Sequence, residues 1–291
     1  MSLGMPYTGS KSQIARDIIS LLPPGKRFVD LFGGGGAMTH AAVLSGKYEE
    51  VLYNEKLPLI ADTFDKAIHG YYTRENFFPR WVSREEFHAV KDKDGYAALC
   101  FSFGYDMETY FCSKEKEPLK KAGHEEYVRG KYQGHGGGMV GSPTSELQEL
   151  ESIERLARLA RLARRCPIEV RCGDYAEYEY KEGDVVYCDP PYRTDQTVKR
   201  FYRNEQDKRK AAFAFEYEAF DAWCDTRDYP VYVSGYEVPD ERFAQVWARE
   251  KISLYAPNDN VSKKTEVVYT QARYKPERVI LPHKQISLLE G

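Results

Sequence analysis

The stretch VVYCDPPY, residues 185–192, decides how the rest of this chain is interpreted. Residues 185–188 are uncharged and mostly apolar, which predicts a buried strand. Two prolines follow Asp189 and cannot continue a sheet ladder, so the strand must end there. The result is a stiff loop at the carboxyl end of a strand, where open α/β sheets bind their ligands. Asp189 and the Pro190 carbonyl offer hydrogen-bond acceptors and Tyr192 offers an aromatic face, a set that suits a flat ring bearing an amino group.

The composition of the whole chain narrows the class of protein. It has 291 residues, 42% hydrophobic and 30% charged, which suits one large catalytic domain with an insertion, or two small domains. The net charge of -3 means that a polyanionic partner must be met by a local basic patch. The six cysteines form no C-x-x-C pair and no histidine has zinc-ligand spacing, so we expect free thiols in a reducing cytosol. No apolar run approaches the ~20 residues of a membrane span, and we therefore expect a cytoplasmic protein without a membrane partner.

A second strand, loop and helix lie near the N-terminus. Residues 28–32 predict a buried strand, residues 33–36 are four consecutive glycines, and residues 37–44 predict a helix that Gly46 ends. Glycines let a ligand approach the backbone and the N-terminus of a helix is electropositive, so this arrangement is typical of nucleotide binding. The loop lacks the Lys-Ser/Thr of a triphosphate-binding P-loop. Strand 51–53 leads to Glu55, about 20 residues after the loop, where an acid binds ribose hydroxyls in such folds.

The remaining pattern alternates strands with helices. We expect strands at residues 168–172, 231–234, 251–255 and 266–270, and helices at residues 57–68, 142–165, 213–223 and 241–247. The last two strands can pair as an antiparallel edge hairpin. Five arginines share the second half of helix 142–165, and we interpret them as structural or solvated rather than as a row that tracks phosphates.

Two segments have the composition of a polynucleotide surface. Residues 96–141 interleave aromatic residues with lysines and arginines and end in a glycine cluster, and residues 193–210 are polar and basic. A solvated insertion and a plain surface loop are the alternative interpretations of these two segments.

Five motifs in chain order resemble those of the Dam-like, D12-class N6-adenine-specific DNA methyltransferases, in particular their phage and prophage members. Residues 6–11 resemble the N-terminal cofactor motif, residues 30–35 the F-x-G-x-G loop, and Asn54 with Glu55 the ribose-binding acid motif. Asp174 with Tyr175 resembles the motif beside the cofactor's adenine ring, and residues 189–192 resemble the catalytic motif.

The resemblance implies a fold, a cofactor and a partner. The fold is an α/β, Rossmann-like S-adenosylmethionine-dependent methyltransferase sheet with an inserted, mainly helical or irregular target-recognition domain. We expect the catalytic domain at residues 5–90 and 143–275, the insertion at residues 91–142 and a C-terminal tail at residues 276–291. The implied methyl donor is S-adenosyl-L-methionine, with no metal, and the implied partner is double-stranded DNA; a cognate restriction endonuclease on a separate chain stays open. The implied cofactor-binding residues are Tyr7, Lys11, Asp30, Phe32, Gly33, Gly35, Glu55, Asp174, Tyr175 and Asp189, and the implied catalytic residues are Asp189, Pro190, Pro191 and Tyr192.

The implied reaction is direct methyl transfer to the N6 amino group of an adenine that has been flipped out of the duplex. Methylation of cytosine N4, RNA adenine or a protein glutamine is the enzymatic alternative. The similar cytosine-N4 enzymes and glutamine methylases usually have Asn or Ser at the position of Asp189, so Asp189 favours adenine. A DNA-binding relative without catalysis is the third possibility. The stretch around Ser102 to Tyr105 only partly matches enzymes that read GATC, so family membership does not define the target sequence.

Overall fold

The computed structural model describes residues 2–129, 148–192, 215–252 and 263–276. These residues group into two compact units. Unit 1 comprises Met1–Ile19 with Pro24–Asp184, and unit 2 comprises Ser20–Pro23 with Val185–Gly291. Several expectations lie outside the described residues: the glycine cluster near residue 135, the start of helix 142–165, the basic segment 193–210, the strand end at 253–255 and most of the tail.

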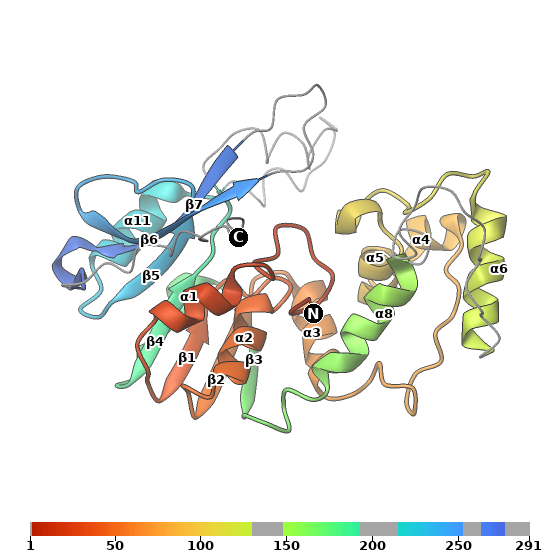
Figure 1. The fold of residues 1–291 in the computed structure, drawn as a ribbon, viewed down its shortest axis with the longest axis horizontal. Helices are drawn as coiled ribbons and strands as arrows, with labels where there is room; N and C mark the ends of the chain where they lie inside the picture. Colours follow the sequence, from red (N-terminus) through yellow and green to blue (C-terminus); the bar gives the residue numbers. More distant parts are fainter. Residues whose placement is uncertain (1, 130–147, 193–214, 253–262, 277–291) are drawn as a thin grey trace, which may run out of the picture. The chain divides into compact units, whose positions relative to one another are not determined.

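Unit 1 contains three parallel strands, in the order β3-β2-β1 (Figure 1). They are β1 (Arg27–Asp30), β2 (Glu50–Glu55) and β3 (Ile168–Cys172). Parallel strands need crossover connections, which are usually helical. Helix α2 (Ala37–Ser45) joins β1 to β2 and packs on both, and α3 (Pro58–Ile68) packs on β2 and β3. This confirms the predicted Rossmann-like α/β class.

Glycines delimit helix α2, as the sequence predicted. Gly36 precedes the helix with φ 69° and Gly46 follows it with φ 66°, both in the left-handed region. Glycine adopts this conformation without steric cost. The helix therefore starts directly after the glycine loop, with its first backbone N–H groups close to it.

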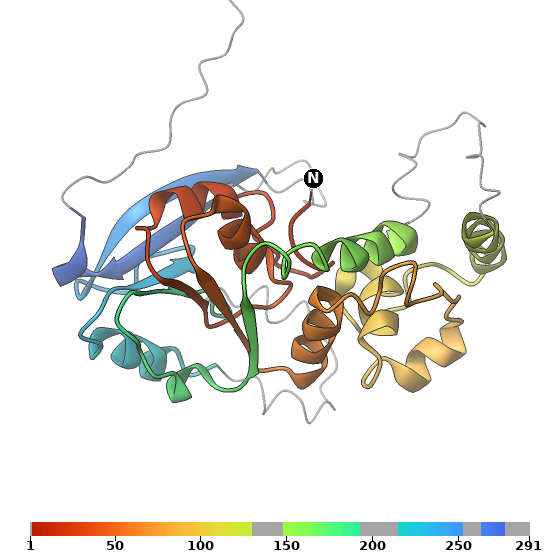
Figure 2. The ribbon, with the colours of Figure 1, turned by 90° about the horizontal axis from the view of Figure 1, so that it is seen from below.

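The chain between α3 and β3 forms a cluster of helices within unit 1. It consists of α4 (Arg84–Val90), α5 (Gly95–Cys100), the short 3₁₀ turn Phe103–Tyr105, α6 (Glu117–Val128) and α8 (Gln148–Leu159). Helix α5 packs against both α3 and α8, and the α5–α8 contact is visible from two directions (Figures 1 and 2). Phe101, Tyr110 and Phe111 are buried here, so these aromatic residues are core, whereas Phe103 is 60% exposed.

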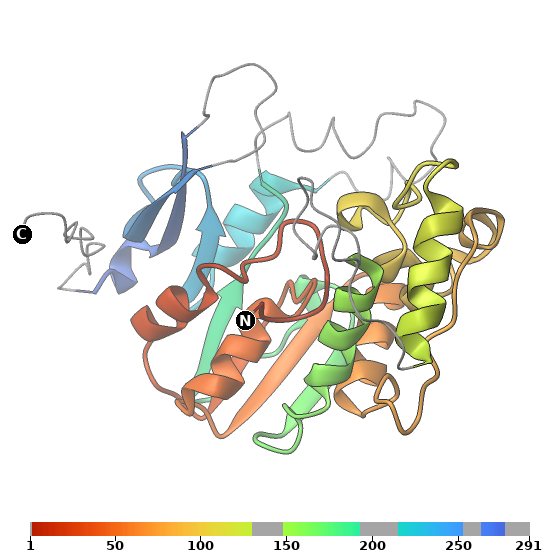
Figure 3. The same cartoon turned by 45° about the vertical axis from the view of Figure 1, so that its right-hand side comes forward.

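Unit 2 is organised by four strands in the order β4-β5-β7-β6 (Figure 3). They are β4 (Asp184–Cys188), β5 (Val231–Gly235), β6 (Phe243–Ile252) and β7 (Lys263–Gln271), and α11 (Tyr217–Asp225) precedes β5. β4 and β5 are parallel, and β7 is antiparallel to both β5 and β6. The predicted antiparallel pairing of the last two strands is therefore confirmed.

The predicted helix over residues 241–247 is wrong, because residues 243–247 belong to strand β6 and residues 241–242 form a turn. A β-bulge shifts the β6–β7 register between Gln245 and Trp247. Phe243, Val246 and Trp247 are consequently all buried. The spacing of three and four residues imitates a helix, although a bulge produces it.

The long arginine-bearing helix ends earlier than predicted. Helix α8 stops at Leu159 rather than near Arg165. Backbone bonds from Leu162 to Leu159 and from Arg165 to Leu162 span three residues and form tight turns before β3. Three further short helices complete the described chain: α1 (Ala15–Leu21) and the 3₁₀ turns Tyr175–Glu177 and Ala272–Tyr274.

Candidate functional site

The glycine loop after β1 is built for close backbone approach. The N–H of Gly33 donates to the Asn54 carbonyl at 2.8 Å, and the Tyr53 hydroxyl donates to the Gly34 carbonyl at 2.7 Å. A Cβ on Gly33 would lie 2.2 Å from the Tyr53 ring, and one on Gly35 would lie 2.6 Å from Cβ of Tyr7. These glycines are therefore required by packing as well as by the shape of the loop.

Glu55, at the end of β2, is hydrogen-bonded to the backbone of the glycine loop. Its two carboxylate oxygens accept hydrogen bonds from the N–H groups of Gly34 and Leu57, both at 2.8 Å. Burial raises the pKa of Glu55, and these N–H donors oppose the shift. A carboxylate oxygen has two lone pairs, so Glu55 can still accept a hydrogen bond from a ligand hydroxyl.

Asp174 and Tyr175 follow β3 and reach the same loop. The rings of Tyr175 and Phe32 are stacked, with centroids 5.4 Å apart. Asp174 accepts hydrogen bonds from Nζ of Lys56 at 2.8 Å and from the N–H of Ala176 at 3.0 Å. Burial opposes ionisation of this carboxyl, but the Lys56 and Ala176 donors lower its pKa overall. Phe32 and Tyr175 thus form an aromatic platform beside an ionised acid.

The N-terminal motif lies along the other side of the glycine loop. The N–H of Met5 donates to the Gly35 carbonyl at 2.6 Å, and the Tyr7 ring is within contact distance of Gly34. Lys11 is 6% exposed, and its carbonyl accepts the N–H groups that start helix α1. The structure therefore brings Tyr7 together with the glycines, and the implied cofactor contacts of Tyr7 and Lys11 stay predictions.

Asp30 has a position that the sequence did not predict. It is 1% exposed, and Oδ2 accepts hydrogen bonds from the backbone N–H and the hydroxyl of Thr39, at 3.2 and 2.9 Å. It thereby fixes the first turn of α2 to the end of β1.

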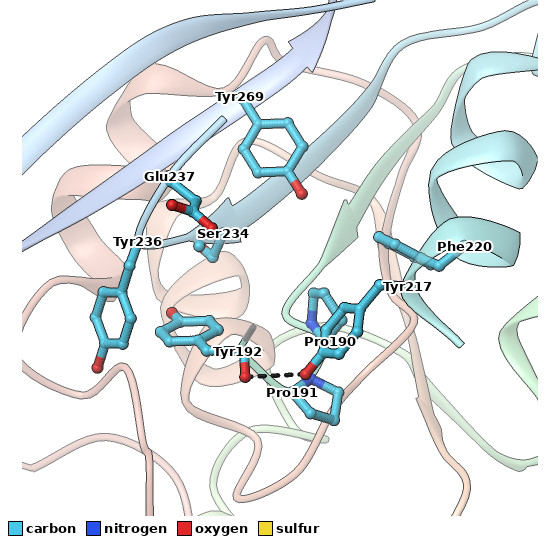
Figure 4. Close-up of a pocket in the computed structure, with 10 residues that line it drawn as sticks. Pro190, Pro191, Tyr192, Tyr217, Phe220, Ser234, Tyr236, Glu237 and Tyr269 are labelled. Carbon is cyan, nitrogen blue, oxygen red and sulfur yellow. Dashed lines mark hydrogen bonds between the residues drawn. The ribbon is translucent and has the colours of Figure 1, made fainter. Parts of the chain in front are cut away.

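Residues 189–192 stand at the carboxyl end of β4 in unit 2, as predicted. Pro190, Pro191 and Tyr192 line a small hollow in unit 2 (Figure 4). The other residues that line it are Tyr217, Phe220, Ser234, Gly235, Tyr236, Glu237 and Tyr269. Five tyrosine or phenylalanine rings therefore surround the hollow, and a flat ligand would meet aromatic faces there.

Tyr192 is held by three contacts within unit 2. Its hydroxyl donates to Oε1 of Glu266, which is 1% exposed, and its carbonyl accepts from the Tyr217 hydroxyl at 2.9 Å (Figure 4). Its ring meets the Tyr236 ring edge-on, with centroids 4.3 Å apart. Burial, together with the charges of Asp189 and Glu266, raises the pKa of Tyr192, so the phenol stays a neutral donor.

The sequence did not identify the neighbours of Tyr192. Residues 234–237 could have been placed near Tyr192 from sequence, because strand β5 was predicted and parallel strands end at the same edge of a sheet. Glu266 and Tyr269 lie on antiparallel β7, and Tyr217 opens α11. Nothing in their local sequence distinguishes these three from ordinary structural residues.

The described ranges contain neither a metal-binding cluster nor a membrane-spanning helix. No group of three or more His, Cys, Asp or Glu side chains among the described residues could hold a metal ion. Within the same part of the chain, no helix has the length and apolar character needed to cross a membrane. All six cysteines are free thiols.

One family model matches most of the chain. The sequence model of the D12 class N6 adenine-specific DNA methyltransferases matches residues 7–262, and the chain therefore belongs to this family. This confirms the family that the five motifs predicted.

Among individual relatives, the chain is similar to the DNA N-6-adenine-methyltransferase of Escherichia phage P1, with 29% identity over 194 residues. The match covers 64% of this chain but only 23% of the phage protein, so the chain spans about a quarter of that relative's length. A solved structure named as a methylase from Haemophilus influenzae has 10% identity and a TM-score of 0.34 over 93% of this chain and 99% of its own.

Proposed function

We propose that this protein transfers a methyl group from S-adenosylmethionine to the N6 amino group of adenine in double-stranded DNA. Membership of the D12 class supports this reaction. The observation that carries it is the placement of Asp189, Pro190, Pro191 and Tyr192 at the carboxyl end of a buried strand, beside a hollow lined by aromatic rings.

The residues of unit 1 suit S-adenosylmethionine, which supplies an electrophilic methyl group on a sulfonium sulfur. Glu55 has acceptor capacity for ribose hydroxyls beside the glycine loop. The stacked pair of Phe32 and Tyr175 offers an apolar platform for an adenine ring. The glycines leave no side chain between a ligand and the backbone that precedes α2.

Activation of the target amine is the task of residues 189–192. An aromatic amine is a poor nucleophile because its lone pair is delocalised into the ring. Asp189 and the Pro190 carbonyl would accept hydrogen bonds from the two amine hydrogens and favour a more tetrahedral nitrogen. S-adenosylmethionine would supply the electrophilic methyl group to this lone pair, and Asp189, which would accept a hydrogen bond from the amine, could take up the proton that the methylated nitrogen releases.

The target base must leave the duplex before it can reach these acceptors, which costs a few kcal/mol. Stacking on an aromatic side chain stabilises the flipped base by ~1–3 kcal/mol. Tyr192 is the ring that we assign to this contact, because Glu266 and Tyr236 already fix its orientation. Preorganisation of this kind lowers the entropic cost of binding the base.

The test is the variant Asp189→Ala, compared with Asp62→Ala on the exposed surface of α3 as a matched control. Plasmid DNA is incubated with S-adenosylmethionine and each protein, and the nucleosides are analysed after digestion. We expect N6-methyladenine with the parent and the control and at least a 100-fold lower rate with Asp189→Ala, as for loss of one electrostatic group in other active sites. S-adenosylmethionine affinity should largely survive.

The same measurement separates the alternatives. Methylcytosine without methyladenine would replace the adenine assignment by cytosine N4, and methylation of RNA alone would replace DNA as the substrate. A parent protein with neither methylation nor measurable S-adenosylmethionine affinity would be a DNA-binding relative without catalysis. A cognate restriction endonuclease and a cytoplasmic location stay predictions.

A further inference from the structure

The side chain of Asn54 joins the ends of three neighbouring strands in unit 1. β2 lies between β1 and β3 (Figure 1), and Asn54 stands near its carboxyl end and is 2% exposed. The ladder of β1 with β2 ends at Asp30, and that of β3 with β2 ends at Cys172. Beyond these ladders, Nδ2 of Asn54 donates to the Leu31 carbonyl at 3.0 Å and to the Gly173 carbonyl at 3.1 Å. Both amide hydrogens therefore hold backbone that the sheet itself does not pair.

The two acceptors determine the orientation of the Asn54 carboxamide. A backbone carbonyl can only accept, so the amide nitrogen must face Leu31 and Gly173 and the amide oxygen must face away from them. That oxygen, Oδ1, is buried and has no hydrogen-bond partner within the described part of the chain. An unmatched buried acceptor lowers stability, and an apolar side chain of similar size would avoid this cost. The amide at this position is therefore explained by the two bonds that it donates.

The two carbonyls belong to the residues that precede the aromatic platform. Leu31 is followed by Phe32, and Gly173 is followed at one residue's distance by Tyr175. The rings of Phe32 and Tyr175 are both partly exposed, and they stack with centroids 5.4 Å apart and planes 27° apart. Asn54 therefore sets the separation of the two backbone segments that carry these rings.

The main chain of Asn54 has a separate task. Its carbonyl accepts the N–H of Gly33 at 2.8 Å and so attaches the glycine loop to β2. This bond does not involve the carboxamide. A substitution of the Asn54 side chain consequently loosens the platform but leaves the attachment of the glycine loop in place.

We propose that Asn54 is a positioning residue for the cofactor, and that its carboxamide holds Phe32 and Tyr175 at the spacing that suits the adenine ring of S-adenosylmethionine. The inference rests on the proposed function, in which these two rings receive the adenine. In this role Asn54 does not contact the ligand and acts through the Leu31 and Gly173 carbonyls. The strength of stacking depends on ring geometry, so a loosened platform weakens every adenine-bearing ligand by the same factor, whatever the sulfur carries.

The test compares S-adenosylhomocysteine with 5′-methylthioadenosine, which keeps the adenine and the ribose but lacks the amino acid. Titration calorimetry measures the affinity of both ligands for the parent, for Asn54→Leu and for Asn76→Leu as a matched control. Asn76 also donates its Nδ2 to a backbone carbonyl, that of Gly70 at 2.9 Å, away from the glycine loop and the platform. Urea midpoints establish that each variant is folded at the assay temperature.

We expect Asn54→Leu to weaken both ligands by about 10-fold, to the same extent for the two, because two hydrogen bonds that hold the platform are lost. Asn76→Leu should leave both affinities unchanged. Unchanged affinity with a lower urea midpoint would show that Asn54 acts on stability alone and would overturn the inference, as would a loss confined to S-adenosylhomocysteine. A parent protein that binds neither ligand would instead overturn the proposed function.

A second variant tests the inference whether or not Asn54→Leu folds. Asn54→Asp places an acceptor against the Leu31 and Gly173 carbonyls, and this setting should raise the pKa of the new carboxyl. Once protonated, the carboxyl can donate one hydrogen bond, as the amide did. Its affinity for 5′-methylthioadenosine, divided by that of the parent at the same pH, should rise at least about 3-fold from about pH 8 to about pH 5.5. The division removes the titration of Glu55 and Asp174, and a ratio independent of pH would overturn the inference.

Discussion

Two glycines at the ends of helix α2 allow a controlled test of how the glycine loop is packed. Gly36 and Gly46 have nearly the same left-handed φ, 69° and 66°. A Cβ on Gly36 would lie 2.2 Å from the Phe64 ring, whereas a Cβ on Gly46 would meet nothing within 4 Å. Alanine at either position costs about 1–2 kcal/mol for the backbone conformation. At Gly36 alone, overpacking against a buried ring adds about 1–3 kcal/mol.

We therefore expect Gly46→Ala to lower the free energy of unfolding by about 1–2 kcal/mol and Gly36→Ala by about 2–5 kcal/mol. Urea denaturation at one pH and temperature measures both losses. Phe64 stacks on Tyr53 with centroids 4.0 Å apart and is fully buried, so it has little room to move. Phe64→Leu should cost less in the Gly36→Ala background than alone. Equal losses at the two glycines, with additive effects of Phe64→Leu, would refute a close approach between the loop and this ring.

Three further predictions concern polar groups. Burial lowers the pKa of His40 to about 4, so between pH 6.5 and 4 the unfolded state binds the proton more readily, and the free energy of unfolding falls as the pH falls through this window. His40→Asn should flatten the dependence of the urea midpoint on pH. An unchanged slope would contradict the assignment of this dependence to His40. Arg27 donates twice to Asp184, whose side chain is 2% exposed, so Arg27→Met should cost about 3–5 kcal/mol in urea unfolding, and adding Asp184→Leu should recover part of it rather than deepen the loss. Tyr192→Phe removes the hydroxyl that Glu266 accepts and should lower stability by about 1–3 kcal/mol; a neutral result would show that this bond contributes nothing.

The parallel strands could be predicted because burial on both faces leaves a continuous apolar run in the sequence. β1 and β4 were found in this way, although β1 ends at Asp30, two residues before the predicted limit, and β4 ends at Cys188. The residues that follow such strands could be placed at one edge of a sheet without knowledge of the side-chain contacts. The sequence predicts Asp189 as a site residue from its place after a strand and Glu55 from its spacing after the glycine loop, and both roles stay predictions.

Contacts between distant segments could not be predicted. Arg155 belongs to a regular row of arginines, and its carbonyl partner on Met5 is 150 residues away. Helical spacing alone does not distinguish a buried arginine of that row from an exposed one. Only packing shows that Arg155 is buried, while Arg161 and Arg164 are exposed. The first part of strand β6 was mistaken for a helix for a related reason, since the bulge between Gln245 and Trp247 depends on its partner strand β7.

The acids at the strand ends look alike in sequence, but their hydrogen-bond partners give them different roles. Asp30, Glu55 and Asp174 each follow or end a strand of unit 1. Asp30 is engaged by Thr39 and fixes the start of α2, whereas Glu55 accepts from the backbone of the glycine loop itself. Hydrogen bonds from Lys56 lower the pKa of Asp174 and keep it charged near the aromatic platform. The contribution of Asp30 to cofactor binding is therefore indirect in our proposal: it sets the position of α2, and thereby of the loop that Glu55 and Asp174 flank.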